Sequence, residues 1–426
     1  MKKIATHTLG CKLNFAETSD LVRKFEDAGW TPVDFNERAD LYVINTCTVT
    51  SIAEKKCRNA IRQAISNNRE AIIAVIGCFA QNAAKEIAAI DGVDIILGND
   101  RKHELLRYVK RKESEGVKTS PDTDTSDPAS FQLSYSRSDR TRTFFKVQDG
   151  CDYFCTYCAI PFARGRSRSA SIAETVAVAK EIAATDSKEV VLTGINTGTF
   201  GQHQGETFYD LIKELDRIEG IERYRISSIE PNLLTDEIIE FVASSRAFLP
   251  HFHIPLQAGS DKVLKMMHRK YDTTFYATLL DKIKKLMPDA CIAADIMAGF
   301  NGETDEEFEK VIAYVKSLPI SYLHVFTFSE RPNTAALRME GKIDIHHRRE
   351  HSRILHEISE EKNRQFYTSQ QGKTRPVLWE SDIKENMMYG FTDNYIRVRK
   401  PYDKGLVNTI TDFCLTKKIE EEEIFE

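Results

Sequence analysis

Three cysteines lie close together near the middle of the chain with the spacing C-x3-C-x2-C. Cys151, Cys155 and Cys158 follow Gly150, and a run predicted to be a strand, residues 144–147, precedes them. A short loop can turn three thiolates toward one small centre, and soft sulfur ligands suit an iron–sulfur cluster or zinc. Zinc normally needs a fourth Cys or His nearby, and none follows directly after Cys158. A four-iron cluster held by three cysteines would keep one iron open for another ligand.

A second set of three cysteines is spread over the first 80 residues. Cys11, Cys47 and Cys78 each come just after a predicted strand, at residues 3–8, 41–45 and 71–76. The carboxyl ends of parallel strands share one edge of a sheet, so we expect these thiols to converge there. The alternative is three separately buried cysteines, which are common in protein cores. Cys57 falls within a predicted helix, and we interpret it as a helix-face residue and not a ligand.

The composition limits the class of protein. The chain has 426 residues, which predicts two or three domains, and a net charge of −5, so any RNA-binding surface must be a local patch. Its nine cysteines are an odd number, and no signal peptide is recognised, which argues against a disulfide framework. No apolar run approaches the ~18–20 residues that span a bilayer. We therefore expect a cytoplasmic protein with reduced thiols and no membrane contact.

The fold class predicted is α/β. Residues 1–112 alternate strands and helices, which indicates a parallel sheet domain. Asn14 and Glu17 are expected to cap its first helix. Residues 113–141 are polar and are interpreted as a linker. Residues 142–368 contain six strand-plus-helix units, which predict an open, partial (β/α)6 version of the eight-unit barrel.

The carboxyl ends of the predicted barrel strands carry polar motifs. They are weak signals individually, because Gly, Ser and Pro are ordinary turn residues, but they share one position in the fold. Chemistry in such barrels gathers at this end of the strands. The candidates are Thr193, Gly194, Asn196, Ser228, Glu230, Gln257 and Asp295.

The last segment, residues 369–426, changes to short β-type runs separated by turns. This pattern suggests a small antiparallel barrel of the kind that binds oligonucleotides. Arg397 and Arg399 are interleaved with Tyr395 and Tyr402, so they could contact phosphates while the tyrosines stack on bases. The alternative is an ordinary solvated strand face.

Three motifs together resemble one family, the radical S-adenosylmethionine (SAM) methylthiotransferases. They are residues 8–14 (TLGCKLN), residues 45–50 (NTCTVT), and the cysteine triplet followed by residues 161–166 (PFARGR). The family's layout is an N-terminal cluster domain, a radical SAM core and a C-terminal TRAM domain, and it covers nearly the whole chain. The first two motifs are most similar to the branch that acts on N6-threonylcarbamoyladenosine in tRNA.

The resemblance implies two [4Fe-4S] clusters, one on Cys151, Cys155 and Cys158 and one on Cys11, Cys47 and Cys78. It implies SAM as cofactor, with Thr193, Gly194 and Asn196 at the position of a motif that usually has the form GGE. Further candidates for the SAM pocket are Ser228, Glu230, Gln257 and Asp295. Arg164 and Arg166 become candidates for binding a carboxylate of SAM or of the substrate. Arg397 and Arg399 become candidates for RNA contacts.

The activity implied is methylthiolation of adenine C2 in threonylcarbamoyladenosine at tRNA position 37, with two SAM used per turnover. The expected partners are a tRNA anticodon stem-loop, a reducing electron donor and a sulfur source. The alternative substrates are isopentenyladenosine tRNA and ribosomal protein S12. A non-enzymatic alternative is an RNA-binding metalloprotein with zinc at the Cys151 triplet.

Overall fold

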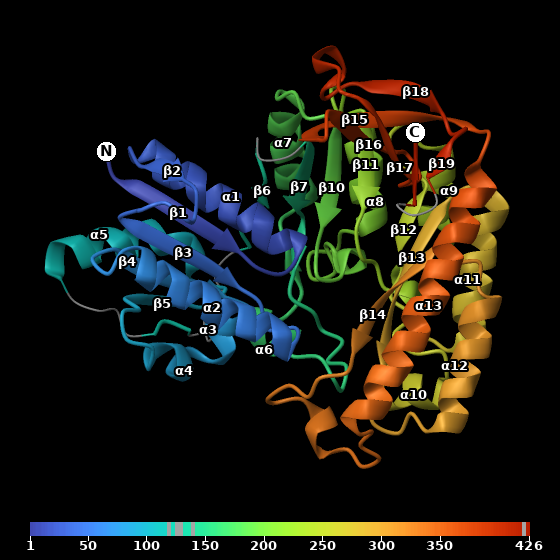
Figure 1. Cartoon of the computed structure of the whole chain (residues 1–426), viewed down its shortest axis with the longest axis horizontal. Helices are drawn as coiled ribbons and strands as arrows, with labels where there is room; N and C mark the ends of the chain where they lie inside the picture. Colours follow the sequence, from blue (N-terminus) through green and yellow to red (C-terminus); the bar gives the residue numbers. More distant parts are fainter. Residues whose placement is uncertain (117–120, 124–130, 138–140, 420–422) are drawn as a thin grey trace.

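The structure, a computed structural model, describes residues 1–116, 121–123, 131–137, 141–419 and 423–426. Three parts are visible in Figure 1: an N-terminal α/β unit, a larger central unit built from parallel strands, and a small sheet at the C-terminus. Within the described residues, no helix combines the length and apolar character needed to cross a bilayer.

The N-terminal unit is a parallel sheet covered by helices on both faces. Its strand order is β2-β1-β3-β4-β5, and every pair in it is parallel. β3 is buried along its whole length, as a central parallel strand must be. The elements are β1 (Lys3–Thr8), α1 (Lys12–Asp27), β2 (Thr31–Val33), β3 (Leu41–Thr46), α2 (Ser51–Asn67), β4 (Ile72–Gly77), α3 (Cys78–Asn82), α4 (Ala84–Ala88), β5 (Ile95–Leu97) and α5 (Leu105–Glu115).

The central unit places six parallel strands around a lumen, with helices outside. Four- and three-stranded sheets, β11-β10-β7-β6 and β12-β13-β14, are joined by bridges from Tyr224 to Phe248 and from Ser228 to His253. The predicted open barrel of six strand-and-helix units is confirmed. The six parallel strands are β7 (Arg142–Lys146), β10 (Glu189–Thr193), β11 (Arg223–Ile226), β12 (His251–His253), β13 (Cys291–Ala298) and β14 (Tyr322–Thr327). β6 (Ser134–Tyr135) pairs antiparallel with β7, and β8 (Gln148–Asp149) and β9 (Arg168–Ser169) form a separate antiparallel pair.

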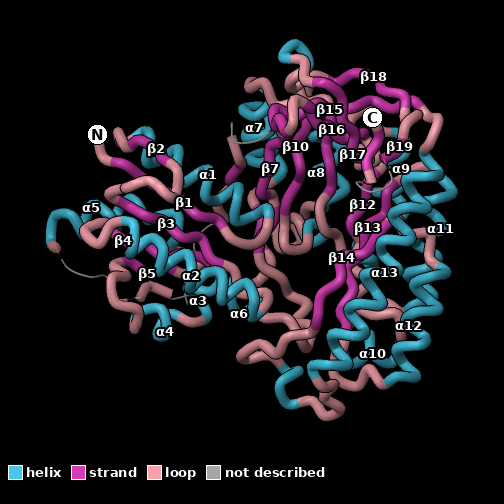
Figure 2. The backbone as a smooth tube through the Cα atoms, in the orientation of Figure 1, coloured by secondary structure: helices cyan, strands magenta, loops and turns pink. Residues whose placement is uncertain are grey.

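The helices of the central unit cover the outer face of its strands, and α13 runs along β13 and β14 (Figures 1 and 2). Their buried side chains join those of the strands in one large hydrophobic cluster. They are α7 (Ile172–Ala183), α8 (Phe208–Asp216), α9 (Asp236–Ser244), α10 (Asp261–Met266), α11 (Thr273–Leu286), α12 (Asp305–Ser317) and α13 (Ile345–Gln370). The short helix α6 (Ile160–Arg164) instead follows the triplet loop and packs against α3 of the N-terminal unit.

The C-terminal sheet has the order β18-β15-β16-β17-β20-β19 and is largely antiparallel, as predicted. Its strands are β15 (Thr374–Lys384), β16 (Met387–Thr392), β17 (Arg397–Pro401), β18 (Ile410–Cys414), β19 (Lys418–Ile419) and β20 (Ile424–Phe425). The sheet lies across the amino ends of the core strands. Arg223 at the start of β11 donates to Pro376 O at 2.8 Å, and Arg142 at the start of β7 pairs with Glu380 at 3.2 Å.

Two local expectations differ from the structure. The first helix begins at Lys12 after Cys11, so Asn14 and Glu17 do not cap it but point inward as buried side chains. The residues interpreted as a linker, 113–141, include β6, which pairs antiparallel with β7; residues 117–120, 124–130 and 138–140 of that range lie outside the described residues. By contrast, the capping box of Ser171 and Glu174 is present at the start of α7.

Candidate active site

The cysteine triplet lies in an irregular loop between β8 and α6, at the carboxyl end of the first core strand. The loop turns tightly: Gly150 has φ +69°, Phe154 has φ +48°, and Cys158 N–H donates to Cys155 O at 3.0 Å. Burial raises the pKa of Cys151 to about 11 and that of Cys158 to about 12. Such thiols keep their protons unless a positive centre stabilises the thiolates, as a metal cluster does.

The second set of cysteines converges as the strand arrangement requires. Thr46 at the end of β3 is the register partner of Gly77 at the end of β4, so Cys47 and Cys78 leave neighbouring strands side by side. A Cβ placed on Gly10 would lie 2.8 Å from Cys47 Cβ, which puts the residue before Cys11 directly against Cys47. Burial, together with the charges of the Cys78 and Cys11 thiols, raises the pKa of Cys47 to about 12.

Cys57 lies behind this second trio. Its Sγ accepts a hydrogen bond from Cys47 N–H at 3.4 Å, and the residue is fully buried in α2. It therefore packs against the backbone of Cys47, which agrees with its interpretation as a helix-face residue.

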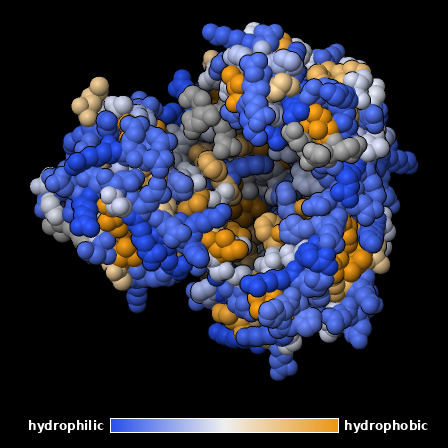
Figure 3. Space-filling view, in the orientation of Figure 1, coloured by the Kyte–Doolittle hydropathy of each residue, from blue (hydrophilic) through white to orange (hydrophobic). Residues whose placement is uncertain are grey.

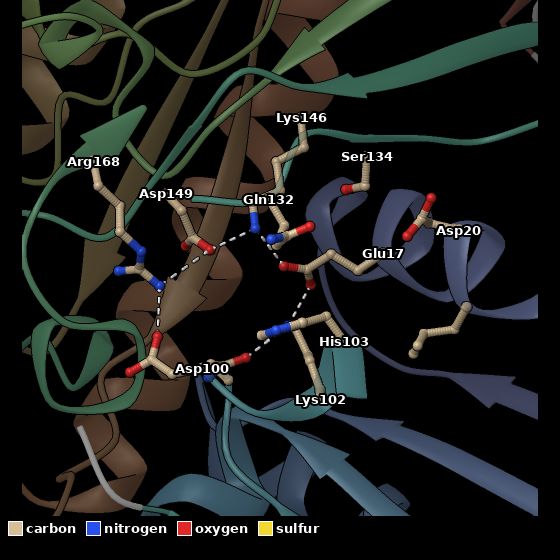
Figure 4. A pocket seen from close by; sticks show the side chains of 12 residues that line it. Glu17, Asp20, Asp100, Lys102, His103, Gln132, Ser134, Lys146, Asp149 and Arg168 are labelled. Atoms are coloured by element: carbon tan, nitrogen blue, oxygen red, sulfur yellow. Dashed lines mark hydrogen bonds and ion pairs between the residues drawn. The ribbon is translucent and has the colours of Figure 1, made fainter. Parts of the chain in front are cut away.

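A cluster of buried charges connects the two cysteine sites. Arg164, in the helix after the triplet, donates to Asn14 Oδ1 at 2.6 Å and Asp149 Oδ1 at 2.9 Å, and lies 3.2 Å from Glu17 Oε2. Lys146 bridges the two carboxylates, at 2.8 Å from each. Figure 4 shows Glu17, Asp149, Lys146 and Lys102 pointing toward one another from the two units. We call Glu17, Lys102, Lys146, Asp149 and Arg164 the interdomain charge cluster.

The interdomain charge cluster reaches the Cys78 site directly. Asn99 donates to Cys78 Sγ at 3.5 Å and to Ala163 O at 2.6 Å, and its own Oδ1 accepts from Lys102 at 2.7 Å. The negative charges of Cys78 and Cys11 as thiolates help to raise the pKa of Arg164. The Nε of Arg164 is buried without a hydrogen-bond partner in the described structure. The fixed cation therefore lies beside the thiols of the N-terminal unit.

A cavity opens next to the triplet loop. Figure 3 shows a hollow between the N-terminal unit and the rest of the molecule, with hydrophobic side chains inside it. Its lining comes from the N-terminal unit, the triplet loop and the strand ends of the core, and Arg331 is the cation among these residues. The lining residues include Thr50, Tyr157, Cys158, Gln257, Asp295, Met297, Phe326 and Arg331.

Thr193, Gly194 and Asn196 pack against the triplet loop through Gln148. The Gln148 side chain accepts from Asn196 N–H at 2.9 Å and donates to Gly150 O at 2.8 Å. Thr193 Oγ1 and both polar atoms of the Asn196 side chain are buried with no partner in the described structure. Buried polar groups are normally hydrogen-bonded, so these atoms are available to a polar ligand or to water.

Ser228 and Asp295 belong to a hydrogen-bonded row across the lumen face. Ser228 Oγ lies 2.8 Å from His253 Nδ1, and Asp295 Oδ1 lies 2.7 Å from His253 Nε2 and 3.1 Å from His324 Nδ1. Burial alone would raise the pKa of Asp295, but the hydrogen bonds from the two histidines outweigh it and hold that pKa below its ordinary value. Gln257 has φ +67°, and its backbone N–H donates to Asp295 O at 2.7 Å.

Glu230 leads to a residue that the sequence did not single out. It forms a short ion pair with Arg269, and Arg269 Nη1 also donates to Cys155 Sγ at 3.2 Å. Arg269 thus places a buried positive charge on one triplet sulfur. It sits just after α10, more than 100 residues from the triplet, and no local motif marks it.

The four arginines predicted to bind ligands have different surroundings. The Arg164 guanidinium is fully buried and occupied by Glu17, Asp149 and Asn14, so it bridges domains and does not face the cavity. Arg166 is exposed beside the triplet loop, 3.4 Å from Asp152. Arg397 is exposed over the ring of Tyr389, and Arg399 pairs with Glu426 at 3.0 Å.

Neither cysteine trio is as compact as a zinc ion requires among the described residues. Thiolates on one zinc ion lie roughly 4 Å apart, because each Zn–S bond is about 2.3 Å. Among the described residues, one group of three side chains, those of His253, Asp295 and His324, has its ligand atoms within 4.8 Å of one another. Neither cysteine trio forms such a group. Three thiolates at each site are a donor set that an iron–sulfur cluster accepts.

Comparison with known proteins identifies the class of enzyme. Residues 3–98 match the family described as uncharacterized protein family UPF0004, and residues 145–315 match the radical SAM superfamily. The fold is similar to that of the radical SAM methyltransferase TsrM from Kitasatospora setae, with a TM-score of 0.59 at 15% identity, covering 79% of this chain and 77% of that one. Fold, matched family and cysteine triplet together define a radical SAM enzyme.

Full-length relatives narrow the class to a family. The chain is 40% identical to the threonylcarbamoyladenosine tRNA methylthiotransferase MtaB of Bacillus subtilis, covering 93% of this chain and 90% of the relative. It is 37% identical to the same enzyme of Aquifex aeolicus (93% and 96%) and 33% identical to a tRNA-2-methylthio-N(6)-dimethylallyladenosine synthase of Clostridium botulinum (96% and 93%). The chain belongs to the radical SAM methylthiotransferases, and it is a transferase whose cofactors are [4Fe-4S] clusters and SAM.

Proposed function

We propose that this enzyme adds a methylthio group to C2 of N6-threonylcarbamoyladenosine at position 37 of tRNA, in the cytoplasm. The observation that carries the proposal is the identity of 40% and 37%, over 93% of the chain, with enzymes named for this substrate, against 33% for a relative named for dimethylallyladenosine. Two SAM are used per turnover: one supplies the methyl group, and one supplies the radical that activates C2.

The residues divide into two holding sites. Cys151, Cys155 and Cys158 hold the cluster that binds SAM, and Cys11, Cys47 and Cys78 hold the auxiliary cluster. Bound there, the clusters supply the electron that cleaves SAM and an iron on which sulfur can be carried. The orphaned polar atoms of Thr193 and Asn196 support their place as polar contacts to SAM.

The protein's own part is binding, orientation and exclusion of water. The cavity between the triplet loop and Thr50 is lined by residues from both cluster-bearing units. In this proposal a nucleoside bound there lies between the two trios. Arg331 supplies a positive charge on this cavity, with its Nη1 paired with Glu54 at 2.7 Å. The threonylcarbamoyl group carries a carboxylate, and an arginine is the side chain best suited to it. In this proposal Arg331, and not Arg164, binds the substrate carboxylate.

In this proposal the C-terminal sheet is a TRAM domain, and residues 369–426 bind the anticodon stem-loop. Arg397 is exposed on β17 and extends over the ring of Tyr389 at 4.6 Å, an arrangement that suits phosphate contact and base stacking. The domain limits follow the same layout, with the auxiliary cluster in residues 1–112 and the radical SAM core in residues 142–368.

The test is an anaerobic assay of the cluster-loaded enzyme with SAM, dithionite and tRNA from a strain lacking the gene. We expect S-adenosylhomocysteine and 5′-deoxyadenosine in comparable amounts, and the 2-methylthio derivative of threonylcarbamoyladenosine by nucleoside mass spectrometry. If the deletion strain keeps that nucleoside and instead loses the methylthio group of isopentenyladenosine, the substrate assignment is wrong. Unchanged methylthio-nucleosides would favour ribosomal protein S12 as the target.

A further inference from the structure

Three metal-ligating side chains face one another on neighbouring core strands, apart from both cysteine trios. They are His253 on β12, Asp295 on β13 and His324 on β14. β13 pairs in parallel with both flanking strands, and Asp295 is the direct register partner of His324. The three residues therefore form a transverse row on the lumen side, while their neighbours Phe252 and Leu323 are buried in the outer core.

The distances between the donor atoms match those around one metal ion. Asp295 Oδ1 is 2.7 Å from His253 Nε2 and 3.1 Å from His324 Nδ1, and the two nitrogens are 3.4 Å apart. For bonds of about 2.1 Å, ligand–metal–ligand angles of about 80–110° give separations of roughly 2.7–3.4 Å. Two imidazoles and one carboxylate on one face of an ion are a common donor set for divalent iron and zinc.

The surroundings also favour a metal. Ser228 Oγ lies 2.8 Å from His253 Nδ1, and in the tautomer that donates this N–H to Ser228, Nε2 is free to bind an ion. Without an ion, two imidazole nitrogens 3.4 Å apart both direct their hydrogens toward the same carboxylate oxygen. The His324 side chain is 45% exposed, and Asp295 lines the cavity beside Cys158. The remaining positions of a bound ion would open into the lumen.

We propose that His253, Asp295 and His324 bind one divalent first-row transition-metal ion, separate from both clusters, with its open positions toward the cavity. Those positions take water or an anionic oxygen of the molecule bound in the lumen. The site is independent of which nucleoside the enzyme modifies.

The experiment titrates Mn²⁺ into the enzyme with both clusters loaded, so that the cysteine thiolates are already occupied. Free Mn²⁺ is followed by electron paramagnetic resonance (EPR). We expect one saturable equivalent that Zn²⁺ displaces, because zinc lies above manganese in the stability order of divalent ions. His324→Ala and Asp295→Asn should weaken binding at least tenfold, and Ser228→Ala, which removes no ligand, by about tenfold.

The matched control is His347→Ala. His347 also pairs with a carboxylate, that of Asp344, but this pair is exposed at the start of α13 and has no third metal-ligating donor close by among the residues that the structure describes. Its loss should leave Mn²⁺ binding unchanged. Iron content and the cluster absorption band check that each variant has folded. Absence of a saturable Mn²⁺ equivalent in the unmodified enzyme, or equal binding by Asp295→Asn and His347→Ala, would leave only a hydrogen-bonded row and overturn the proposal.

Discussion

Arg164, six residues after Cys158, lies 3.2 Å from Glu17, six residues after Cys11. The pair joins the core to the N-terminal unit. Its two members follow the last cysteine of the triplet and the first cysteine of the N-terminal trio. Both side chains are buried, and Asp149, directly before Gly150 of the triplet loop, shares the same guanidinium. The relative placement of the two cysteine sites is therefore fixed by ionic contacts between side chains of opposite units.

Arg164→Met should destabilise the enzyme strongly, because it leaves the carboxylates of Glu17 and Asp149 buried with less compensation. Removing one partner of a buried pair costs ~3–5 kcal/mol, which would appear in the free energy of unfolding by denaturant. The control is Arg353→Met on α13, which breaks two ion pairs whose partners are more than half exposed. That change should cost under about 1 kcal/mol. Equal losses in the two variants would contradict a stabilising role for the interdomain charge cluster.

The same contacts predict how stability depends on pH. Burial alone would raise the pKa of Glu17 and of Asp149, but Arg164 and the two lysines outweigh it and hold both below their ordinary values. Groups with a depressed pKa stabilise the fold above their unfolded pKa, near 4, and lose that contribution as the pH falls. We expect a melting temperature that is flat from pH 8 to 6 and falls below about pH 5. Arg164→Met should show a shallower fall; an equally steep one would assign the acid sensitivity to other groups.

Iron content separates the two cysteine sites. The loaded enzyme should hold about eight irons, and Cys47→Ala or Cys155→Ala should each reduce this to about four. Cys57→Ala is the matched control, because Cys57 is as buried as Cys47 and touches its backbone but is not one of the proposed ligands. It should keep about eight irons by colorimetric assay. A loss of four irons in Cys57→Ala would indicate that the Cys57 thiol is a cluster ligand.

Arg331→Gln tests recognition of the substrate carboxylate. A charge-assisted hydrogen bond contributes roughly 1.5–3 kcal/mol, so kcat/KM for tRNA carrying threonylcarbamoyladenosine should fall about 10- to 100-fold. The SAM-cleavage rate without tRNA should stay within about twofold. Arg166→Gln, at an exposed arginine beside the triplet loop, is the comparison. A larger fall of kcat/KM in Arg166→Gln would indicate that the substrate carboxylate binds outside the cavity.

Much of the arrangement could be predicted from sequence because it depends on strand order alone. In a parallel sheet, Cys11, Cys47 and Cys78 must meet at one edge once the strands before them are recognised. The surroundings of Arg164 and Arg269 could not be predicted, since each depends on packing between segments far apart in the chain. The row of His253, Asp295 and His324 required the register of β12, β13 and β14, which periodicity does not supply.

The C-terminal sheet and the triplet loop lie at opposite ends of the core strands, and β7 alone has 5 residues. At about 3.3 Å per residue, such a strand is roughly 17 Å long. Under the proposed function, an RNA bound by the C-terminal sheet and modified beside the triplet loop would have to span at least that distance. Shortened hairpins that keep the target base but not the distal helix would be released before they are modified.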